Sequence, residues 1–272
     1  FPTRRSSDLR ENPDISSADL SNAVVSSYNF NGVRSGAYAV TKATVPQATN
    51  AEYIYRDGFH DQAIYLDGTY GLDLGSANEL GDNYTISFWM NPDELHTIND
   101  PTLTAGTFDP QRWLSLTFGR AIWSSNSGTN TGVFVDTAGT VTYTKGEWQN
   151  VILSVKGETA TLYLDGEKYA TGSIAPNIMS SENAKVYFGV NAWDAYYKGL
   201  LDDVIMMNRT ITDEEALAIA YCFVDSGKTK YPSSGSSDTK SSENTLTNME
   251  ITGYDVTKVE NANQYTVTIP YE

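Results

Sequence analysis

The clearest indication of the fold class is the sequence EWQNVILSVKGETATLYLDGEKYATGS, residues 147–173. Its first part alternates polar with apolar side chains, the apolar ones being Val151, Leu153 and Val155. A period of two is typical of a strand with one buried face. Residues 156–158 and the pair Asp165-Gly166 are turn signals, so the stretch predicts three antiparallel strands joined by tight turns.

Two further stretches repeat this pattern. In NYTISFWMNP, residues 83–92, Tyr84, Ile86, Phe88 and Met90 fall on one face, and Thr85, Ser87 and Asn91 on the other. Trp89 alone interrupts the polar face. In KVYFGV, residues 185–190, the predicted apolar side consists of Val186, Phe188 and Val190. Because such stretches recur between turn residues from Val24 to Met207, the sequence predicts an all-β antiparallel sandwich or jelly roll.

One short helix is expected at the C-terminal side of the sandwich. Thr212 and Glu215 have the spacing of a capping box, in which each side chain bonds the backbone amide of the other. An apolar stripe follows before Gly227, made of Ala216, Leu217, Ile219, Ala220 and Phe223. We therefore predict a helix that closes the domain.

Composition divides the chain into four parts. Residues 1–9, FPTRRSSDL, look like the translation of a sequencing-library adapter and are set aside as an artefact, and residues 10–22 form a polar linker. The sandwich is expected over residues 23–227. Residues 228–245 are Ser-rich and poor in apolar side chains, which predicts a second linker. Residues 246–272 return to strand-like alternation, and we interpret them as the truncated start of an immunoglobulin-like domain of a larger protein.

Charge and cysteine content restrict the classes of partner. The net charge is −16, from 18 Lys and Arg against 34 Asp and Glu, which argues against binding to nucleic acid or to an anionic membrane. No apolar run approaches the roughly 20 residues of a membrane-spanning helix. Cys222 is the single cysteine, so it forms no disulfide within the chain, and we expect it to be a small buried helix residue.

The order of these motifs resembles the LamG-like jelly-roll domains (laminin G-like, concanavalin A-like lectin/glucanase type) of bacterial extracellular proteins. The resemblance covers residues 23–221. It rests above all on LYLDG, residues 162–166, followed by GLLDDVIMMNRTITDEE, residues 199–215. The resemblance implies a concanavalin A-like jelly roll that is secreted or displayed at the cell surface.

Two acidic residues lie side by side in the last predicted strand. Side chains of Asp202 and Asp203 should point to opposite faces, so we expect no catalytic dyad. Asp202 shares its predicted face with the apolar residues Val204 and Met206, and a carboxylate there needs a partner: backbone amides or a Ca²⁺ ion. The resemblance implies a structural Ca²⁺ near the end of the first strand, at Asn31, although the usual D-x-S-G sequence is replaced by VRSG.

The concanavalin A-like fold that the resemblance implies also supports glucanases, which depend on catalytic carboxylates. Retaining glycosidases need two carboxylates about 5 Å apart, and the E-x-D-x-x-E strand that supplies them in this fold is absent from the sequence. His60 and His96 are the two histidines, and neither accompanies a nucleophile motif. We therefore expect no enzyme activity in this fragment.

Aromatic and planar polar residues in predicted loops favour sugar binding, because aromatic faces stack on the C–H surfaces of sugars. Segment 191–199 contributes Trp193, Asp194 and Tyr196, segment 120–132 contributes Trp123, and segment 108–116 contributes Arg112 and Trp113. Surface tryptophans also cap sandwich cores, so both interpretations stay open for each residue. Trp148, directly before a strand, is expected to be a core or rim anchor.

Three functional hypotheses follow from the sequence. The first is a non-catalytic carbohydrate-binding module appended to a secreted or surface polysaccharide-degrading enzyme, with polysaccharides or oligosaccharides and the neighbouring domains of the same chain as partners. The alternative is a structural spacer or protein-adhesion module of an extracellular multi-domain protein. A degenerate hydrolase is the third hypothesis, and it would require two carboxylates that converge in a concave groove.

Overall fold

The computed structural model describes most of residues 20–230 and two short strands near the C-terminus. The described residues are 20, 22–32, 36–41, 51–77, 79–94, 100–108, 111–119, 121–126, 134–137, 143–221, 223–225, 228–230, 255–258 and 265–268. The chain forms two compact units, residues 1–231 and 232–272.

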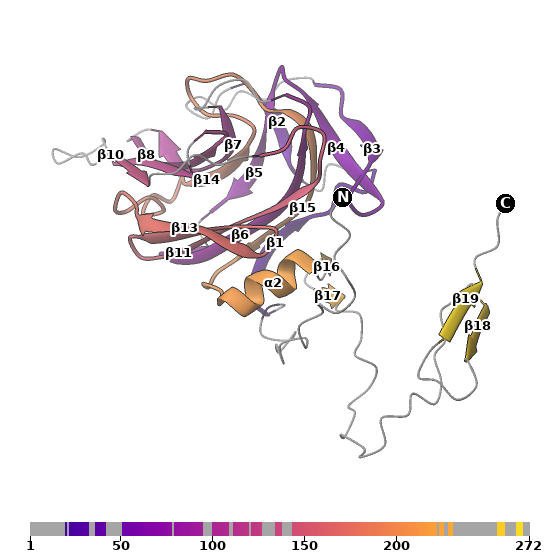
Figure 1. Cartoon of the computed structure of the whole chain (residues 1–272). Helices are drawn as coiled ribbons and strands as arrows, with labels where there is room; N and C mark the ends of the chain where they lie inside the picture. Colours follow the sequence, from indigo (N-terminus) through magenta and orange to yellow (C-terminus); the bar gives the residue numbers. More distant parts are fainter. Residues whose placement is uncertain are drawn as a thin grey trace, which may run out of the picture. The chain divides into compact units, whose positions relative to one another are not determined.

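Two large antiparallel sheets form the sandwich of the first unit (Figure 1). The eight-stranded sheet has the order β13 (Glu167–Ser173), β12 (Thr159–Leu164), β11 (Gln149–Lys156), β6 (Asn83–Pro92), β15 (Lys198–Met207), β4 (Gln62–Asp67) and β3 (Ile54–Asp57), with β1 (Val24–Tyr28) also paired to β15. The seven-stranded sheet has the order β10 (Phe134–Thr137), β9 (Ile122–Asn126), β8 (Gln111–Thr117), β7 (Pro101–Phe108), β14 (Lys185–Phe188), β5 (Gly71–Ser76) and β2 (Tyr38–Val40). Both sheets are antiparallel and pair strands that are far apart in sequence, such as β6 and β15, so the predicted antiparallel jelly-roll sandwich is confirmed. The elements assigned among the described residues include one short helix, as predicted.

The core lies between the two sheets and contains the predicted alternating side chains. Tyr84, Ile86, Phe88 and Met90 of β6 and Val151, Leu153 and Val155 of β11 all belong to it. Phe88 meets Phe188 of the opposite sheet edge to face, with ring centroids 5.1 Å apart. Burial of one such side chain contributes about 1.5–3 kcal/mol. The burial of these alternating side chains is therefore the main force that holds the two sheets together.

One predicted core residue lies elsewhere. Val190 belongs to a separate cluster with Trp113, on the outer face of the seven-stranded sheet. The strand β14 ends at Phe188, and Gly189 has φ of 70°, a left-handed conformation that breaks the alternation. The prediction that Val190 continues the apolar face of Phe188 is therefore wrong.

The helix α2 (Asp213–Tyr221) packs on the outer face of the eight-stranded sheet (Figure 1). The predicted capping box is present: Glu215 N donates to Thr212 Oγ1 at 3.2 Å, and Thr212 N donates to Glu215 Oε2 at 2.9 Å. The helix is shorter than predicted, because Phe223 lies in β16 (Phe223–Asp225), which pairs with β17 (Lys228–Lys230) in a hairpin. With nine residues α2 is too short to cross a bilayer, and no other helix among the described residues is long and apolar enough.

The second unit contains an antiparallel pair, β18 (Asp255–Lys258) and β19 (Tyr265–Thr268). Its interpretation as the start of an immunoglobulin-like domain stays a prediction, as do the predicted domain boundaries. Residues 1–9, the polar segment up to residue 19 and residues 231–254 lie outside the described residues. The strand β17 falls inside the range predicted as a linker, so regular structure extends at least to Lys230.

Candidate functional site

Three tryptophans from separate segments meet on the outer face of the seven-stranded sheet. Trp113 comes from β8, Trp123 from β9 and Trp193 from the loop between β14 and β15. The prediction of a loop is therefore confirmed for Trp193 and wrong for Trp113 and Trp123, which belong to paired strands. The ring centroid of Trp113 lies 5.2 Å from that of Trp123 and 5.3 Å from that of Trp193. We call these residues the tryptophan cluster. Trp113 is only 4% exposed whereas Trp193 is 52% exposed, so the cluster has a buried centre and an open edge.

Sheet register explains how Trp113 and Trp123 reach each other. Trp113 pairs with Ser125 of β9 and with Gly106 of β7, while Trp123 pairs with Ser115 of β8. The two indoles are thus diagonal neighbours on one face, a spacing that large aromatic side chains bridge. Small residues at the paired positions leave the space above the sheet to the rings.

Apolar side chains support the cluster from the sheet side. Val40, Tyr187, Val190 and Ala192 form a buried group with Trp113, and Trp123 and Tyr196 pack against it. The hydroxyl of Tyr196 donates to the carbonyl oxygen of Thr41. Tyr196 therefore ties the loop that carries Trp193 to the end of β2.

The side chain of Asn191 shapes that loop. The backbone amides of Trp193 and Asp194 both donate to Asn191 Oδ1 at 2.8 Å, and Asn191 Nδ2 donates to Asp194 Oδ2 at 2.6 Å. Burial raises the pKa of Asp194 and the nearby Asp100 raises it further, while the hydrogen bond from Asn191 opposes them. This local turn holds the indole of Trp193 at the surface with a partly buried carboxyl beside it.

The structure separates Arg112 from this group. Adjacent residues of a strand point to opposite faces, and the guanidinium of Arg112 donates to Ser180 Oγ at 2.7 Å, in the loop before β14. Trp193, Trp123, Tyr196 and Asp194 are thus brought together around Trp113, and Arg112 is not. The burial of Trp113 favours a supporting role under the other rings over the direct ligand contact predicted for it.

The predicted face of Asp202 needs a correction. A bulge interrupts β15 between Asp202 and Ile205, and Asp203 has φ of 43°. Asp202 consequently pairs with Trp89 on the outer face of the eight-stranded sheet, while Val204 and Met206 lie in the core. The expectation that Asp202 shares the face of those two residues is wrong, because it assumed an unbroken alternation.

Both acidic residues turn toward the segment 58–61. Asp202 is fully buried; its Oδ2 accepts the amide of His60 at 3.0 Å, its Oδ1 accepts the amide of Asp203 at 2.8 Å, and the amide of Phe59 is a further donor. Burial raises the pKa of Asp202 to about 7 although these amides lower it. Asp203 Oδ2 lies 2.6 Å from His60 Nδ1.

Backbone amides occupy the oxygens that were predicted to bind calcium. Those of Asp202 accept the amides just described, and Asn31 Oδ1 accepts the amide of Gln62 at 3.0 Å. Across the part of the chain that the structure describes, no group of three or more His, Cys, Asp or Glu side chains could hold a metal ion. The calcium site at Asp202 and Asn31 stays a prediction.

A second aromatic group lies beside Asp202, and sequence analysis missed it. Phe59 stacks on Trp89 with ring centroids 3.5 Å apart and an interplanar angle of 11°. Its ring also meets those of His60 and Trp148 edge to face, at 4.6 and 6.0 Å. The signal that could have found this group was Trp89, the one large apolar residue on an otherwise polar strand face. We call Phe59, Trp89 and Trp148 the phenylalanine cluster.

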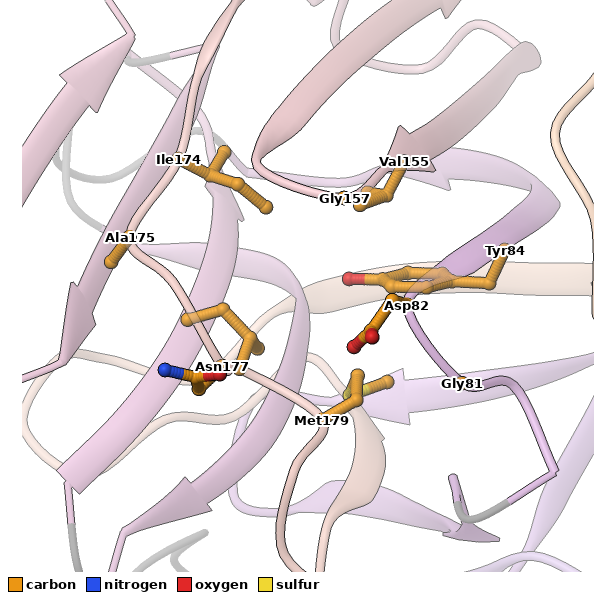
Figure 2. A pocket seen from close by; sticks show the side chains of 10 residues that line it. Gly81, Asp82, Tyr84, Val155, Gly157, Ile174, Ala175, Asn177 and Met179 are labelled. Atoms are coloured by element: carbon orange, nitrogen blue, oxygen red, sulfur yellow. The ribbon is translucent and has the colours of Figure 1, made fainter.

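A small pocket opens at the start of β6 (Figure 2). Its lining includes Tyr84, Gly157, Ile174 and Met179, and the hydroxyl of Tyr84 points into it. The volume of about 20 Å³ accommodates roughly one water molecule. The pocket is therefore too small for a sugar.

The comparisons with known proteins agree with this architecture. A family model described as concanavalin A-like lectin/glucanases superfamily matches residues 66–216. Domain 4 of the extracellular arabinanase AbnA from Geobacillus stearothermophilus, solved in complex with arabinotriose, is similar in structure with a TM-score of 0.61 and 24% identity, over 72% of this chain and 98% of that domain. The binding domain of Paraclostridial Mosquitocidal Protein 1 aligns with a TM-score of 0.50 and 16% identity, over 74% of this chain and 52% of that one. A search of the curated proteins found no match.

Proposed function

The chain belongs to the concanavalin A-like lectin/glucanase superfamily, and from this premise we propose that it is a non-catalytic module that binds a neutral glycan at the tryptophan cluster. Trp193 and Trp123 are the contact residues, Asp194 and Tyr196 flank them, and Trp113 supports them.

The main support for this proposal is that the ring of Trp193 is exposed to solvent while it packs against the buried indole of Trp113. An exposed tryptophan is unfavourable in water, and Trp193 is 52% exposed although its backbone is fixed by Asn191. A ring held in one orientation loses little conformational entropy when it stacks on a ligand. The polar groups of the neighbouring loop can then bond the hydroxyls of a sugar whose C–H face lies on the indole.

Charge favours a neutral ligand over an acidic one. The chain carries a net charge of −16, and Asp194 and Asp100 lie close enough for their carboxyl groups to interact. A uronic acid bound here would place its carboxylate near these groups, at an electrostatic cost. Neutral pentose or hexose oligomers avoid that cost.

The shared fold with the arabinanase domain supports a choice of first ligands. That domain was solved with arabinotriose, so arabino-oligosaccharides should be tested first, followed by xylo-oligosaccharides. We extend the proposal to a secreted or cell-surface polysaccharide-degrading parent enzyme, in which this module would hold the catalytic domain near its polymer.

Titration calorimetry of residues 20–230 with these oligosaccharides and with polygalacturonate tests the proposal. Trp193→Ala combined with Trp123→Ala should lower the affinity of the tryptophan cluster for the neutral ligand at least tenfold. Tyr169→Ala is the matched control, because Tyr169 is 42% exposed but lies on β13 of the other sheet. If the folded wild-type protein bound no glycan at all, the spacer or adhesion alternative would take its place.

A further inference from the structure

The phenylalanine cluster has the geometry of a ligand platform. Trp89 covers one face of the Phe59 ring at 3.5 Å, yet Phe59 remains 37% exposed. The exposed part of the ring therefore lies away from Trp89. Trp89 and Trp148 are half-buried beside it, so three rings together form an aromatic surface.

A buried carboxylate fixes the turn that presents Phe59. Asp202 accepts the amides of Phe59 and His60, and the amide of Gly58 donates to the carbonyl of Asp61 at 2.9 Å. A Cβ atom at Gly58 would lie 2.7 Å from Asp202 Oδ2, so this close approach requires glycine. The ring of Phe59 is thus preorganised, as an aromatic residue for stacking should be.

This platform lies on the opposite side of the sandwich from the tryptophan cluster. Trp89 alternates with the core residues Phe88 and Met90, so it projects from the outer face of the eight-stranded sheet. Trp113 alternates with the core residue Leu114 and projects from the outer face of the seven-stranded sheet. One short oligosaccharide cannot contact both clusters.

We propose that the phenylalanine cluster is a second binding site for a neutral glycan, with Phe59 as the stacking residue, so that one module holds two glycan chains. The inference rests on the proposed function only for the class of ligand. Acidic side chains again argue for that class: Asp61 lies close enough to Asp202 to act on its charge, and Asp203 lies against His60. The exposed side chains of Asp61 and Gln62 border the same turn and can bond sugar hydroxyls.

Titration calorimetry with a neutral trisaccharide separates the two sites. Wild-type protein should bind two trisaccharides per chain, Trp193→Ala should keep the site at Phe59, and Phe59→Ala should keep the site at Trp193. Phe59→Leu retains an apolar side chain on Trp89 without an aromatic face and should weaken the second site about tenfold, or about 1.4 kcal/mol. Phe59→Tyr restores the face and should restore binding.

Cross-linking gives an independent measurement. A module with two sites should precipitate a long neutral polysaccharide, and either Trp193→Ala or Phe59→Leu should abolish precipitation. One trisaccharide per chain, lost in Trp193→Ala and unchanged in Phe59→Ala, would overturn the second site and leave the proposed function standing. Absence of glycan binding by the folded wild-type protein would overturn both.

Discussion

The two aromatic clusters present one exposed ring each, but different forces hold those rings. Trp193 rests on the buried indole of Trp113, which is packed among apolar side chains of the seven-stranded sheet. Phe59 rests on Trp89, and the turn that carries Phe59 is anchored by the buried carboxylate of Asp202. The first cluster thus depends on hydrophobic packing and the second on hydrogen bonds to a buried acid.

Substitutions in the two clusters should therefore affect the stability of different parts of the protein. Apolar packing loses free energy in proportion to the volume removed, so damage to the first cluster should reach the whole domain. A buried carboxylate that satisfies turn amides acts locally, and its removal leaves donors without an acceptor. The following substitutions test the contrast, in order of their expected effect on the free energy of unfolding.

Trp113→Ala should have the largest effect. Loss of a buried tryptophan costs about 3–5 kcal/mol, and Trp193 and Trp123 would also lose the ring between them. Urea denaturation measures the stability, and titration with a neutral oligosaccharide measures binding at the tryptophan cluster. Trp113→Phe should lose less stability than Trp113→Ala. An unchanged glycan affinity of Trp113→Ala would show that Trp113 does not support the binding positions of Trp193 and Trp123.

Asp202→Ala should destabilise the protein by about 2–3 kcal/mol, because the amides of Phe59, His60 and Asp203 lose their acceptor. Binding at the phenylalanine cluster should weaken while binding at the tryptophan cluster stays constant. Asp202→Asn keeps one acceptor oxygen, so its free energy of unfolding should lie between those of the wild type and Asp202→Ala. Equal weakening of both sites would mean that the two clusters are not independent.

Glu215→Gln should lower stability by about 1–2 kcal/mol at pH 7 without touching either cluster. Glu215 accepts two hydrogen bonds from Arg209, at 2.9 and 2.5 Å, and one from the Thr212 amide. Burial alone would raise the pKa of Glu215, but these donors outweigh it and lower the pKa. The stabilisation is therefore present above the ordinary Glu pKa of about 4.3 and is lost as pH falls through the lower folded value.

Thermal unfolding of wild type and Glu215→Gln between pH 3 and 7 checks this expectation. The two melting curves should converge at acidic pH and differ at neutral pH. Glycan binding at pH 7 should be the same for both proteins, which makes Glu215→Gln the control for general destabilisation. A constant difference across this pH range would contradict the role of the Glu215 charge.

Trp193→Ala should have the smallest effect on stability, below about 0.5 kcal/mol, because the side chain is more than half exposed. Its effect on glycan affinity at the tryptophan cluster should nevertheless be at least tenfold. Denaturation and titration of the same protein sample make the comparison direct. A large loss of stability would show that Trp193 caps the core and has no need of a ligand.

Sequence patterns predicted the parts of the fold that depend on neighbours in the chain. Alternation placed Phe88 and Leu153 in the core, and the spacing of Thr212 and Glu215 predicted the start of α2. Predictions failed at two residues with left-handed backbone: Gly189 moved Val190 to the outer face, and the bulge at Asp203 moved Asp202. Such local breaks of the strand period have no marker in the alternation itself.

The aromatic sites show the same division. Sequence patterns correctly placed Trp193 and Tyr196 in a loop and showed one unexpected indole on the strand of Trp89. They wrongly placed Trp123 in a loop, because the Gly- and Ser-rich residues that follow it concealed the strand β9. Three features follow only from the folded arrangement: Trp113 lies between two other indoles, Arg112 points away from them, and Phe59 stacks on Trp89. The physical reason is that these contacts join residues separated by 10 to 80 positions in the chain, and the pairing of strands and the packing of the loop after β14 bring them together.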